Sequence, residues 1–368
     1  MTVSSDRSNS AIRLVVMPGD GIGPEITAAT LAVLGAADRR FGLNLEFEEI
    51  AVGLAALKAR GTTLPDDAFE RAKAADGVIL GPVSHHDYPP PAQGGLNPSG
   101  EMRKRLDLYA NIRPARSRAG FPPRCGKPLD LVIVRENTEG FYADRSMHVG
   151  IGDLMPTPDL AISIRKITRE GSTRIAEQAF RLAARRPRRL VTAVHKANVL
   201  RVSDGFFLDC VRAVAARYPA VRYEERIIDA MAALLVRDAS QFDVIVTTNM
   251  FGDILSDEAA EISGSLGLAA SINAGAAHAL AQAQHGSAPD IAGKDVANPA
   301  SLIGSAAMLL GWLAERRSDA RLARAADAIE AALDAVIAQP EWRTADLGGP
   351  LGTQAFGARV AAAMQGAD

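Results

Sequence analysis

Short apolar runs alternate with longer amphipathic stretches along this chain, and no other feature limits its possible folds as strongly. The apolar runs are rich in β-branched residues, as buried strands are, and cover residues 12–17, 77–80, 129–134, 190–194 and 244–248. The amphipathic stretches have helical spacing and include residues 26–40, 171–185 and 203–217. Alternating strands and helices predict an α/β fold.

Three further segments complete the predicted organisation. Residues 89–100 are rich in Pro, Gly, Asn and Ser and predict a loop, and residues 144–158 predict a second irregular stretch. The tail at 301–363 predicts Ala-rich helix with one break at 340–350. With 368 residues, the chain is long enough for two domains or for one large α/β unit with its own core.

Charge gives no sign of a nucleic-acid or membrane partner, and the cysteine spacing gives no sign of a zinc site. Lys and Arg number 41 and Asp and Glu number 43, so the net charge of -2 gives no sign of binding to nucleic acid or to a membrane. Cys125 and Cys210 lack zinc-site spacing, which favours free thiols in a reducing compartment. Residues 1–10 are polar, and no apolar run is long enough for a membrane span, so we expect a soluble cytoplasmic protein.

A glycine-rich turn follows the first predicted strand and opens the first helix. Gly19, Gly21 and Gly23 suggest a dinucleotide-binding turn, although their spacing is not GxGxxG. A tight turn between a strand and a helix explains the same glycines equally well.

Three arginines lie at the ends of predicted elements: Arg103, Arg113 and Arg135. The paired N–H donors of a guanidinium match the two oxygens of a carboxylate, so three together predict a clamp for a di- or tricarboxylate. For any one of them alone, a surface ion pair is the simpler interpretation.

Two carboxylates follow the strand at 244–248 and lie four positions apart. Asp253 and Asp257 therefore share one helix face, and a divalent ion would neutralise their repulsion. A preference for acids near a helix N-terminus explains Asp253 well and Asp257 less well. Asp229 stands in an apolar setting and is a plausible third ligand.

The sequence signals for proton transfer and for nucleotide binding are weaker than those for the arginine and aspartate groups. Lys196 follows an apolar strand and Tyr142 follows a Glu-Gly-Phe sequence, so either is a candidate acid or base, although each alone is more often structural. Residues 285–293 form a Gly- and Pro-rich loop that can hold a nucleotide, with Asp290 placed to bind a free ribose hydroxyl. An ordinary surface loop fits as well, and the His85-His86 pair is more simply a loop feature than a metal site.

Taken together, the segments 135–142, 195–198, 249–257 and 285–298 give the chain a resemblance to the isocitrate/isopropylmalate dehydrogenase family of β-decarboxylating, metal-dependent dehydrogenases. The resemblance implies an α/β, two-domain isopropylmalate dehydrogenase-like fold with a mixed central sheet, not a Rossmann fold. It implies a first, cofactor-side domain of residues 1–108 and 264–368. Residues 109–263 would form a second domain with a dimer arm and the metal and substrate residues. A homodimer with shared active sites is also implied.

The resemblance further implies individual roles. The expected substrate clamp is Arg103, Arg113 and Arg135. The expected Mg²⁺ or Mn²⁺ ligands are Asp253, Asp257 and, from the partner subunit, Asp229. Lys196, also from the partner subunit, is expected to act as the base and Tyr142 as the acid. The expected contacts to NAD are Ile22, Asn198, His285, Gly286, Ser287, Ala288, Asp290, Ile291 and Asn298.

The implied reaction is the NAD-dependent oxidative decarboxylation of a (2R)-3-substituted malate that resembles isocitrate or isopropylmalate. Isopropylmalate enzymes present apolar side chains before the first clamp arginine, whereas residues 96–102 here form a polar stretch in which Asn97 and Ser99 favour a polar C3 substituent. Gln282 replaces the family's usual Glu and leaves the NAD preference intact. Tartrate/D-malate and homoisocitrate dehydrogenases are the alternatives within the family, and a non-catalytic nucleotide- or metabolite-binding dimer is the alternative of another class.

Overall fold

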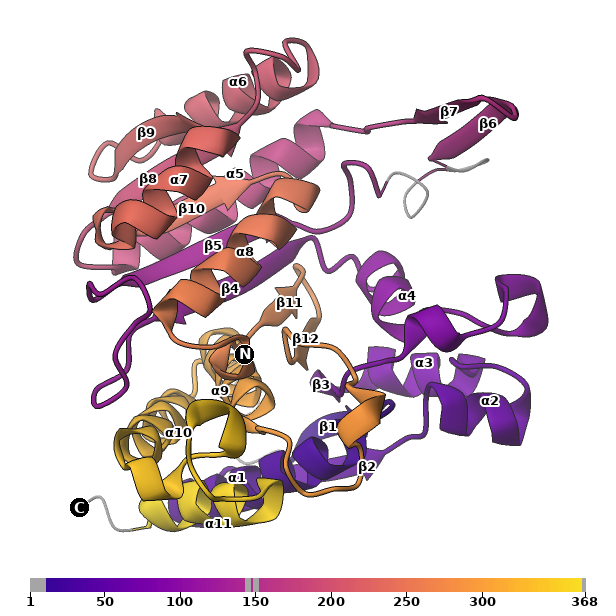
Figure 1. Ribbon diagram of the computed structural model, residues 1–368, viewed down its shortest axis with the longest axis vertical. Helices are drawn as coiled ribbons and strands as arrows, with labels where there is room; N and C mark the ends of the chain where they lie inside the picture. The colour runs from indigo at the N-terminus through magenta and orange to yellow at the C-terminus, as the bar shows by residue number, and fades with distance from the viewer. Residues whose placement is uncertain (1–10, 143–146, 148–151, 366–368) are drawn as a thin grey trace, which may run out of the picture.

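A computed structural model describes residues 11–142, 147 and 152–365, and a ten-stranded mixed sheet runs through it with helices on both faces (Figure 1). The strand order is β2-β1-β3-β12-β11-β4-β5-β10-β8-β9. The strands are β1 (Ile12–Met17), β2 (Leu45–Glu49), β3 (Gly77–Leu80), β4 (Ala110–Arg116), β5 (Asp130–Glu136), β8 (Leu190–His195), β9 (Arg222–Ile227), β10 (Val244–Thr247), β11 (Ile272–Ala274) and β12 (Ala279–Gln282). The two remaining strands, β6 (Asp153–Thr157) and β7 (Leu160–Ser163), form a separate ribbon that projects from the body.

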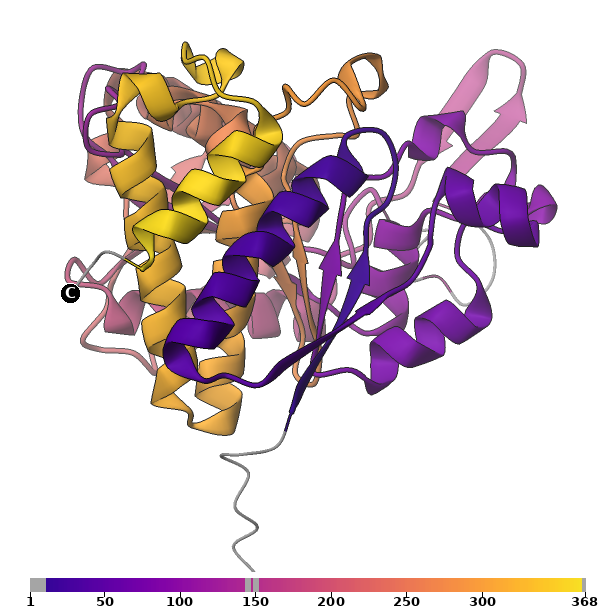
Figure 2. The ribbon, with the colours of Figure 1, turned by 90° about the horizontal axis from the view of Figure 1, so that it is seen from below.

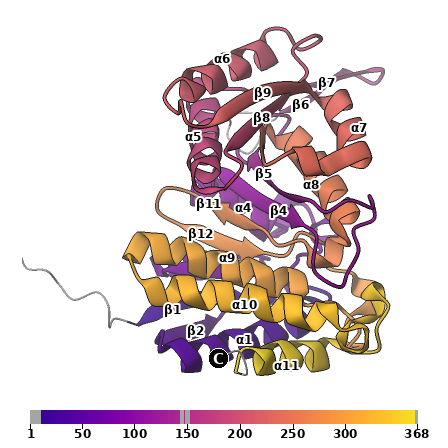
Figure 3. The ribbon, with the colours of Figure 1, turned by 90° about the vertical axis from the view of Figure 1, so that its left-hand side faces the viewer.

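Helices cover both faces of this sheet, and Figures 2 and 3 show α9, α10, α1 and α11 packed together at one end. The helices are α1 (Gly23–Phe41), α2 (Leu54–Arg60), α3 (Asp66–Ala74), α4 (Pro98–Arg105), α5 (Arg169–Arg185), α6 (Ser203–Ala215), α7 (Ile228–Asp238), α8 (Asn249–Ser263), α9 (Ala300–Arg317), α10 (Ala320–Ala338) and α11 (Thr353–Ala363). Because helices bury both faces, β3, β8 and β10 are mostly apolar and are buried at every position. The predicted α/β class with a mixed central sheet is confirmed.

The direction of the strands changes in the middle of the sheet. β11 is antiparallel to both of its neighbours, β12 and β4, and β4 is antiparallel to β5, whereas all other pairs are parallel. Separate apolar clusters pack on the β1–β3 side and on the β5–β10 side of this change. We propose that the β11–β4 pair is the boundary between a first domain of residues 1–108 and 264–368 and a second of residues 109–263.

The turn between β1 and α1 brings a distant loop against the first strand. A Cβ on Gly21, whose φ is +58°, would stand 1.9 Å from the carbonyl oxygen of Ser287, so only glycine permits this approach. The next residue, Ile22, donates its backbone N–H to the same oxygen at 2.8 Å. The predicted cofactor loop at 285–293 is therefore anchored on the glycine turn.

Three expectations about local structure were wrong. The tail has a second break, because Ser318 adopts a left-handed conformation with φ of 53° between α9 and α10. The predicted loop at 89–100 and the polar stretch at 96–102 overlap α4, which begins at Pro98 because Asn97 caps the Gly100 N–H and Pro is favoured in the first helical turn. The predicted irregular stretch at 144–158 contains β6; residues 144–146 and 148–151 of it lie outside the described residues.

Two expectations about the chain as a whole concern membranes and cysteines. Among the described residues, no helix combines the length and apolar character needed to cross a membrane. Cys125 and Cys210 are both free thiols, as predicted.

Candidate active site

A cavity of about 430 Å³ lies where the two parallel parts of the sheet meet. Its walls follow the carboxyl ends of β3, β12 and β5, the edge at which α/β folds bind ligands. The cavity is lined by Pro82, Val83, His85, His86, Asn97, Ser99, Arg103, Arg113, Arg135, Tyr142, Asp253, Ser271, Gln282, Ala283, Gln284, His285 and Gly286. Residues far apart in the sequence thus share one site.

The three predicted clamp arginines all reach this cavity from different elements. Arg103 lies on α4, Arg113 on β4, and Arg135 near the end of β5. Arg135 is 2% exposed, and its Nε and Nη2 donate to Asn249 Oδ1 at 2.9 and 2.7 Å. Burial and the neighbouring Arg135 charge lower the pKa of Arg113 to about 10, so it stays charged at neutral pH. Charged donors gathered in one buried place suit a multiply charged carboxylate.

The two predicted metal carboxylates face these arginines from α8. Arg113 Nη1 lies 3.3 Å from Asp253 Oδ1 and 3.3 Å from Asp257 Oδ1, and Arg135 forms an ion pair with Asp253. Burial raises the pKa of Asp253, but the charges of Arg135, Arg113 and Arg103 outweigh it and hold the pKa below its usual value. Gly252 permits this contact, because a Cβ there would stand 2.7 Å from Arg135 Cβ.

The donor set of this helix face suits a hard divalent ion. Asp253 and Asp257 supply carboxylate oxygens one turn apart, which Mg²⁺ and Mn²⁺ favour. Within the described parts of the chain, no group of three or more His, Cys, Asp or Glu residues is placed to hold a metal. The expectation that Asp229 of a second copy supplies a third ligand stays a prediction.

The predicted base and the predicted third metal ligand lie together, but outside this cavity. Lys196 Nζ pairs with Asp229 Oδ1 at 2.5 Å, and neither residue lines the cavity that contains Asp253. This pair lowers the pKa of Asp229. Such a location agrees with the expectation that both residues act in the site of a partner subunit, which stays a prediction.

The predicted acid, Tyr142, lies within the cavity. Its hydroxyl donates to Asp253 Oδ2 at 3.4 Å, on the side of the carboxylate opposite the arginine contacts. The phenol is thus placed beside the expected metal ligand and the clamp, where a substrate carboxylate would lie.

The predicted cofactor residues divide into two groups. His285 and Gly286 line the cavity, Ser287 is held against Ile22, and Asp290 with Ile291 forms a short 3₁₀ turn at Pro289–Ile291. Ala288 precedes that turn in a left-handed conformation, and Asn298 is buried and donates to Asp346 Oδ2 at 3.0 Å. Asn198, by contrast, is exposed next to Lys196 and outside the cavity.

The residues beside this loop suit a nucleotide. Burial lowers the pKa of His285, so its ring is neutral, and its buried Nε2 has no hydrogen-bond partner among the described residues. A nucleotide base would supply one. The exposed Asp290 carboxylate is available for a ribose hydroxyl.

The part of the cavity wall formed by the start of α4 and the end of β12 is polar. Ser99 Oγ donates to Gln282 Oε1 at 2.9 Å, and both residues are buried. Asn97, at the N-cap of α4, also lines the cavity. The predicted polar character of this wall is therefore present in the fold.

Sequence reasoning missed several residues that shape the site. Asp20, inside the glycine turn, is buried and accepts hydrogen bonds from the backbone N–H groups of Leu54 at 2.7 Å and Ser84 at 2.9 Å. His85 and His86 line the cavity, with ring centroids 3.9 Å apart. The sequence offered one signal for Asp20, which is an acidic residue between two glycines, Gly19 and Gly21.

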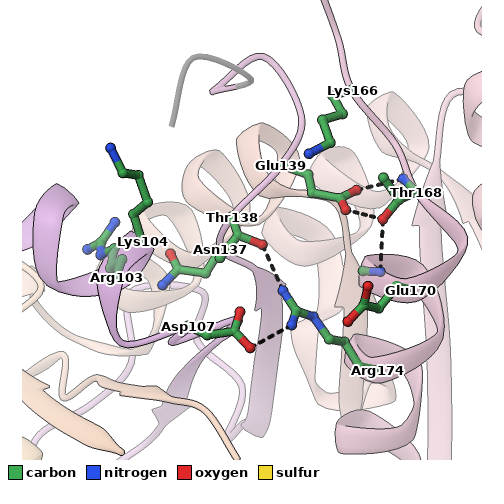
Figure 4. Close-up of a pocket in the computed structure, with 11 residues that line it drawn as sticks. Arg103, Lys104, Asp107, Asn137, Thr138, Glu139, Lys166, Thr168, Glu170 and Arg174 are labelled. Atoms are coloured by element: carbon green, nitrogen blue, oxygen red, sulfur yellow. Dashed lines mark hydrogen bonds and ion pairs between the residues drawn. The ribbon is translucent and has the colours of Figure 1, made fainter. Parts of the chain in front are cut away.

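A second cavity, of about 460 Å³, adjoins the first (Figure 4). Arg103 lines both cavities, and the second lies between α4 and the N-terminal end of α5. Arg174 pairs with Asp107 at 2.8 Å across it, and Thr168 donates its backbone N–H to Glu139 at 2.7 Å. These contacts tie the start of α5 to the 137–139 segment that follows β5.

Known proteins resemble this chain over nearly its full length. The sequence profile of the isocitrate/isopropylmalate dehydrogenase family matches residues 13–360. An isocitrate/homoisocitrate dehydrogenase of Thermus thermophilus is 42% identical over 355 residues, covering 96% of this chain and 99% of that protein. A 3-isopropylmalate dehydrogenase of Methanothermobacter thermautotrophicus is 41% identical over 352 residues, covering 95% and 98%.

Two further relatives extend this comparison. A catalytic subunit of the mitochondrial NAD isocitrate dehydrogenase of Arabidopsis thaliana is 39% identical, covering 95% of this chain and 87% of that one. The crystal structure of isocitrate dehydrogenase from Methylococcus capsulatus superposes with a TM-score of 0.85 at 38% identity, covering 96% and 99%. The predicted family and enzyme class are confirmed. The chain belongs to the isocitrate/isopropylmalate dehydrogenase family and is an enzyme of the decarboxylating dehydrogenase class.

Proposed function

We propose that this enzyme catalyses the NAD-dependent oxidative decarboxylation of a (2R)-3-substituted malate, with Mg²⁺ or Mn²⁺ as the metal. The observation that carries the proposal is the meeting of Arg103, Arg113, Arg135, Tyr142 and Asp253 in one cavity beside the His285 loop. This arrangement combines a carboxylate clamp, an acid and a metal carboxylate with the neutral His285 ring.

The substrate is a di- or tricarboxylate whose C3 substituent is polar. Ser99, Asn97 and Gln282 present hydrogen-bonding groups where an isopropyl group would require apolar contacts. A site that offers such groups rejects a substituent that cannot pair with them. An isocitrate-like substrate therefore fits better than isopropylmalate, and homoisocitrate and tartrate or D-malate are the alternatives.

Each of the proposed site residues has a defined task in the reaction. The arginines bind and orient the carboxylates, and Lys196 of a second copy takes the proton of the C2 hydroxyl. When bound, the nicotinamide supplies a hydride acceptor and the metal supplies positive charge near the C2 oxygen. Tyr142, beside Asp253, then donates a proton to the carbon that has lost CO₂.

The working form is a homodimer in the cytoplasm, with no nucleic acid or membrane as a partner. Apolar side chains that a lone chain leaves exposed support a second copy as the partner: Leu154, Met155, Leu160 and Ile162 on the projecting ribbon, and Val236 and Ile254 on α7 and α8. A dimer through this face would bring Asp229 and Lys196 of one copy toward the α8 face of the other. Two free thiols suit a reducing compartment.

The test is NADH formation with Mn²⁺ across isocitrate, homoisocitrate, isopropylmalate, tartrate and D-malate, with NADP as the control cofactor. We expect metal-dependent, NAD-selective turnover that is fastest with a substrate carrying a polar substituent. Absence of turnover with all five, together with retained NAD binding, would instead support the non-catalytic binding dimer. Preference for isopropylmalate would contradict the substrate assignment alone.

A further inference from the structure

A glutamine next to the cofactor loop contacts one of the expected metal carboxylates. Gln284 Nε2 donates to Asp257 Oδ1 at 2.8 Å. Gln284 follows β12, in the part of the sheet that we assign to the first domain, whereas Asp257 lies on α8 in the second. The hydrogen bond therefore starts at the cavity wall, which Gln284 lines, and joins the two parts of the sheet beside the cavity.

The backbone of Gln284 is firmly placed. Its N–H donates to Ser301 Oγ at 3.2 Å, near the start of α9, and Ser301 is fully buried. The preceding residue, Ala283, is buried, and the following residue, His285, begins the cofactor loop. A shift of that loop would therefore also move the Gln284 side chain.

The orientation of the Asp257 carboxylate depends strongly on its hydrogen bond from Gln284, because Asp257 has few other contacts. The Asp257 side chain is 55% exposed, and its other protein contact is Arg113 Nη1 at 3.3 Å. That same Nη1 also contacts Asp253 and donates to Ser256 Oγ at 2.7 Å, so Asp257 has only a share of it. Both contacts are made by Oδ1, and among the described residues none donates to Oδ2. Gln284 thus orients the carboxylate and leaves one oxygen for a ligand.

We propose that Gln284 is a positioning residue that fixes the Asp257 carboxylate for the divalent metal and couples the metal site to the cofactor loop. The proposal rests on the proposed function, because it takes Asp257 as a metal ligand. Hydrogen bonds from outside the first coordination shell hold ligating carboxylates in place, and their loss typically weakens metal binding about 10- to 100-fold. A metal on Asp257 also restrains Gln284, and through it the adjacent loop.

The first test measures binding of Mn²⁺ alone, by the electron paramagnetic resonance signal of free Mn²⁺, to the full-length chain. Gln284→Met keeps the length of the side chain and removes the donor. Gln241→Met is the matched control, since Gln241 is an exposed glutamine that donates to the Asp238 carbonyl oxygen at 2.8 Å, outside the cavity. We expect Gln284→Met to raise the Kd for Mn²⁺ about 10-fold or more, and Gln241→Met to leave it unchanged.

Coupling to the cofactor loop gives a second readout. We expect Mn²⁺ to tighten NADH binding to the wild type, measured by calorimetry, by about 5-fold or more, and Gln284→Met to abolish this effect. An equal Kd for Mn²⁺ in wild type and Gln284→Met would overturn the positioning role, even if the wild type turns over. No Mn²⁺ binding by the wild type would overturn the metal assignment itself, and this inference with it. Weaker Mn²⁺ binding with the NADH effect intact would overturn the coupling.

Discussion

Lys196 and Asp229 form an ion pair, with Nζ 2.5 Å from Oδ1, outside the cavity that contains Asp253 and Tyr142. One chain thus holds the expected base and the expected third metal ligand next to each other, but away from its own substrate clamp. If a second copy supplies both, they arrive together, and each active site needs two chains.

Complementation between two inactive variants tests this shared site. Lys196→Met and Asp253→Asn should each fold and lose turnover, because one removes the proposed base and the other a proposed metal carboxylate. When the two variants are unfolded and refolded together, a hybrid dimer has one site with both residues intact. Random mixing should restore about a quarter of wild-type activity. Recovery no greater than that of either variant refolded alone would show that Lys196 acts in its own chain.

The substrate clamp is tested at Arg103, which lies on α4 at the cavity wall. Arg103→Met should lower kcat/KM for the carboxylate substrate about 10- to 100-fold, because a charged hydrogen-bond donor is lost, while the KM for NAD stays the same. Arg105→Met is the control, since Arg105 stacks on Phe69 at 3.5 Å and does not line the cavity. An equal rise in the KM of both substrates would indicate a general distortion of α4.

The charge of Asp253 predicts how stability responds to pH. Its arginine neighbours hold its pKa below the usual 3.8, so its stabilising contribution is complete above that value and is lost as pH falls through the lower folded value. Urea unfolding of the ligand-free wild type and Asp253→Asn should therefore show a stability difference at pH 6 that shrinks below about pH 4. A difference that stays constant with pH would exclude the ion pairs as its cause.

Removing the Tyr142 hydroxyl tests the role of the acid. Tyr142→Phe should lower kcat for the overall reaction about 10²- to 10⁴-fold, because it removes the hydroxyl that we propose as the proton donor to carbon after CO₂ leaves. Metal and NAD binding should persist. Tyr109→Phe is the control, since Tyr109 lies against Arg174 outside the cavity. Unchanged turnover in Tyr142→Phe, measured by NADH and CO₂ release, would remove Tyr142 from the chemistry.

The strands that were predicted correctly are those with buried, apolar sequences. The ranges 12–17 and 77–80 match β1 and β3 because all but one of their side chains are buried. β9 (Arg222–Ile227) escaped prediction because it is a charged edge strand, and β11 (Ile272–Ala274) because it is only 3 residues long and holds its place through its neighbours.

In the candidate site, too, the features set by local sequence were predicted, and those set by the packing of distant elements were not readable from local patterns. Asp253 and Asp257 were found because helical spacing places them on one face, a property of local sequence. The separation of Lys196 from the cavity of its own chain and the bond from Gln284 to Asp257 depend on how distant elements pack, and no local pattern carries that information. The resemblance to known dehydrogenases led us to expect Lys196 in a partner's site, whereas the Gln284–Asp257 bond became visible only in the structure.

The proposed preference for a polar substrate is tested at Ser99, in the polar wall of the cavity. Ser99→Ala should remove a hydroxyl beside the C3 substituent without adding bulk to a buried position. The ratio of kcat/KM for isocitrate to that for isopropylmalate should therefore fall about 10-fold or more, because the apolar substrate loses nothing while the polar one loses a partner. Ser240→Ala, in the 3₁₀ turn at Ala239–Gln241, is the control. If kcat/KM falls equally for both substrates, Ser99 supports Gln282 rather than selecting the substituent, and the polar specificity must then come from Asn97.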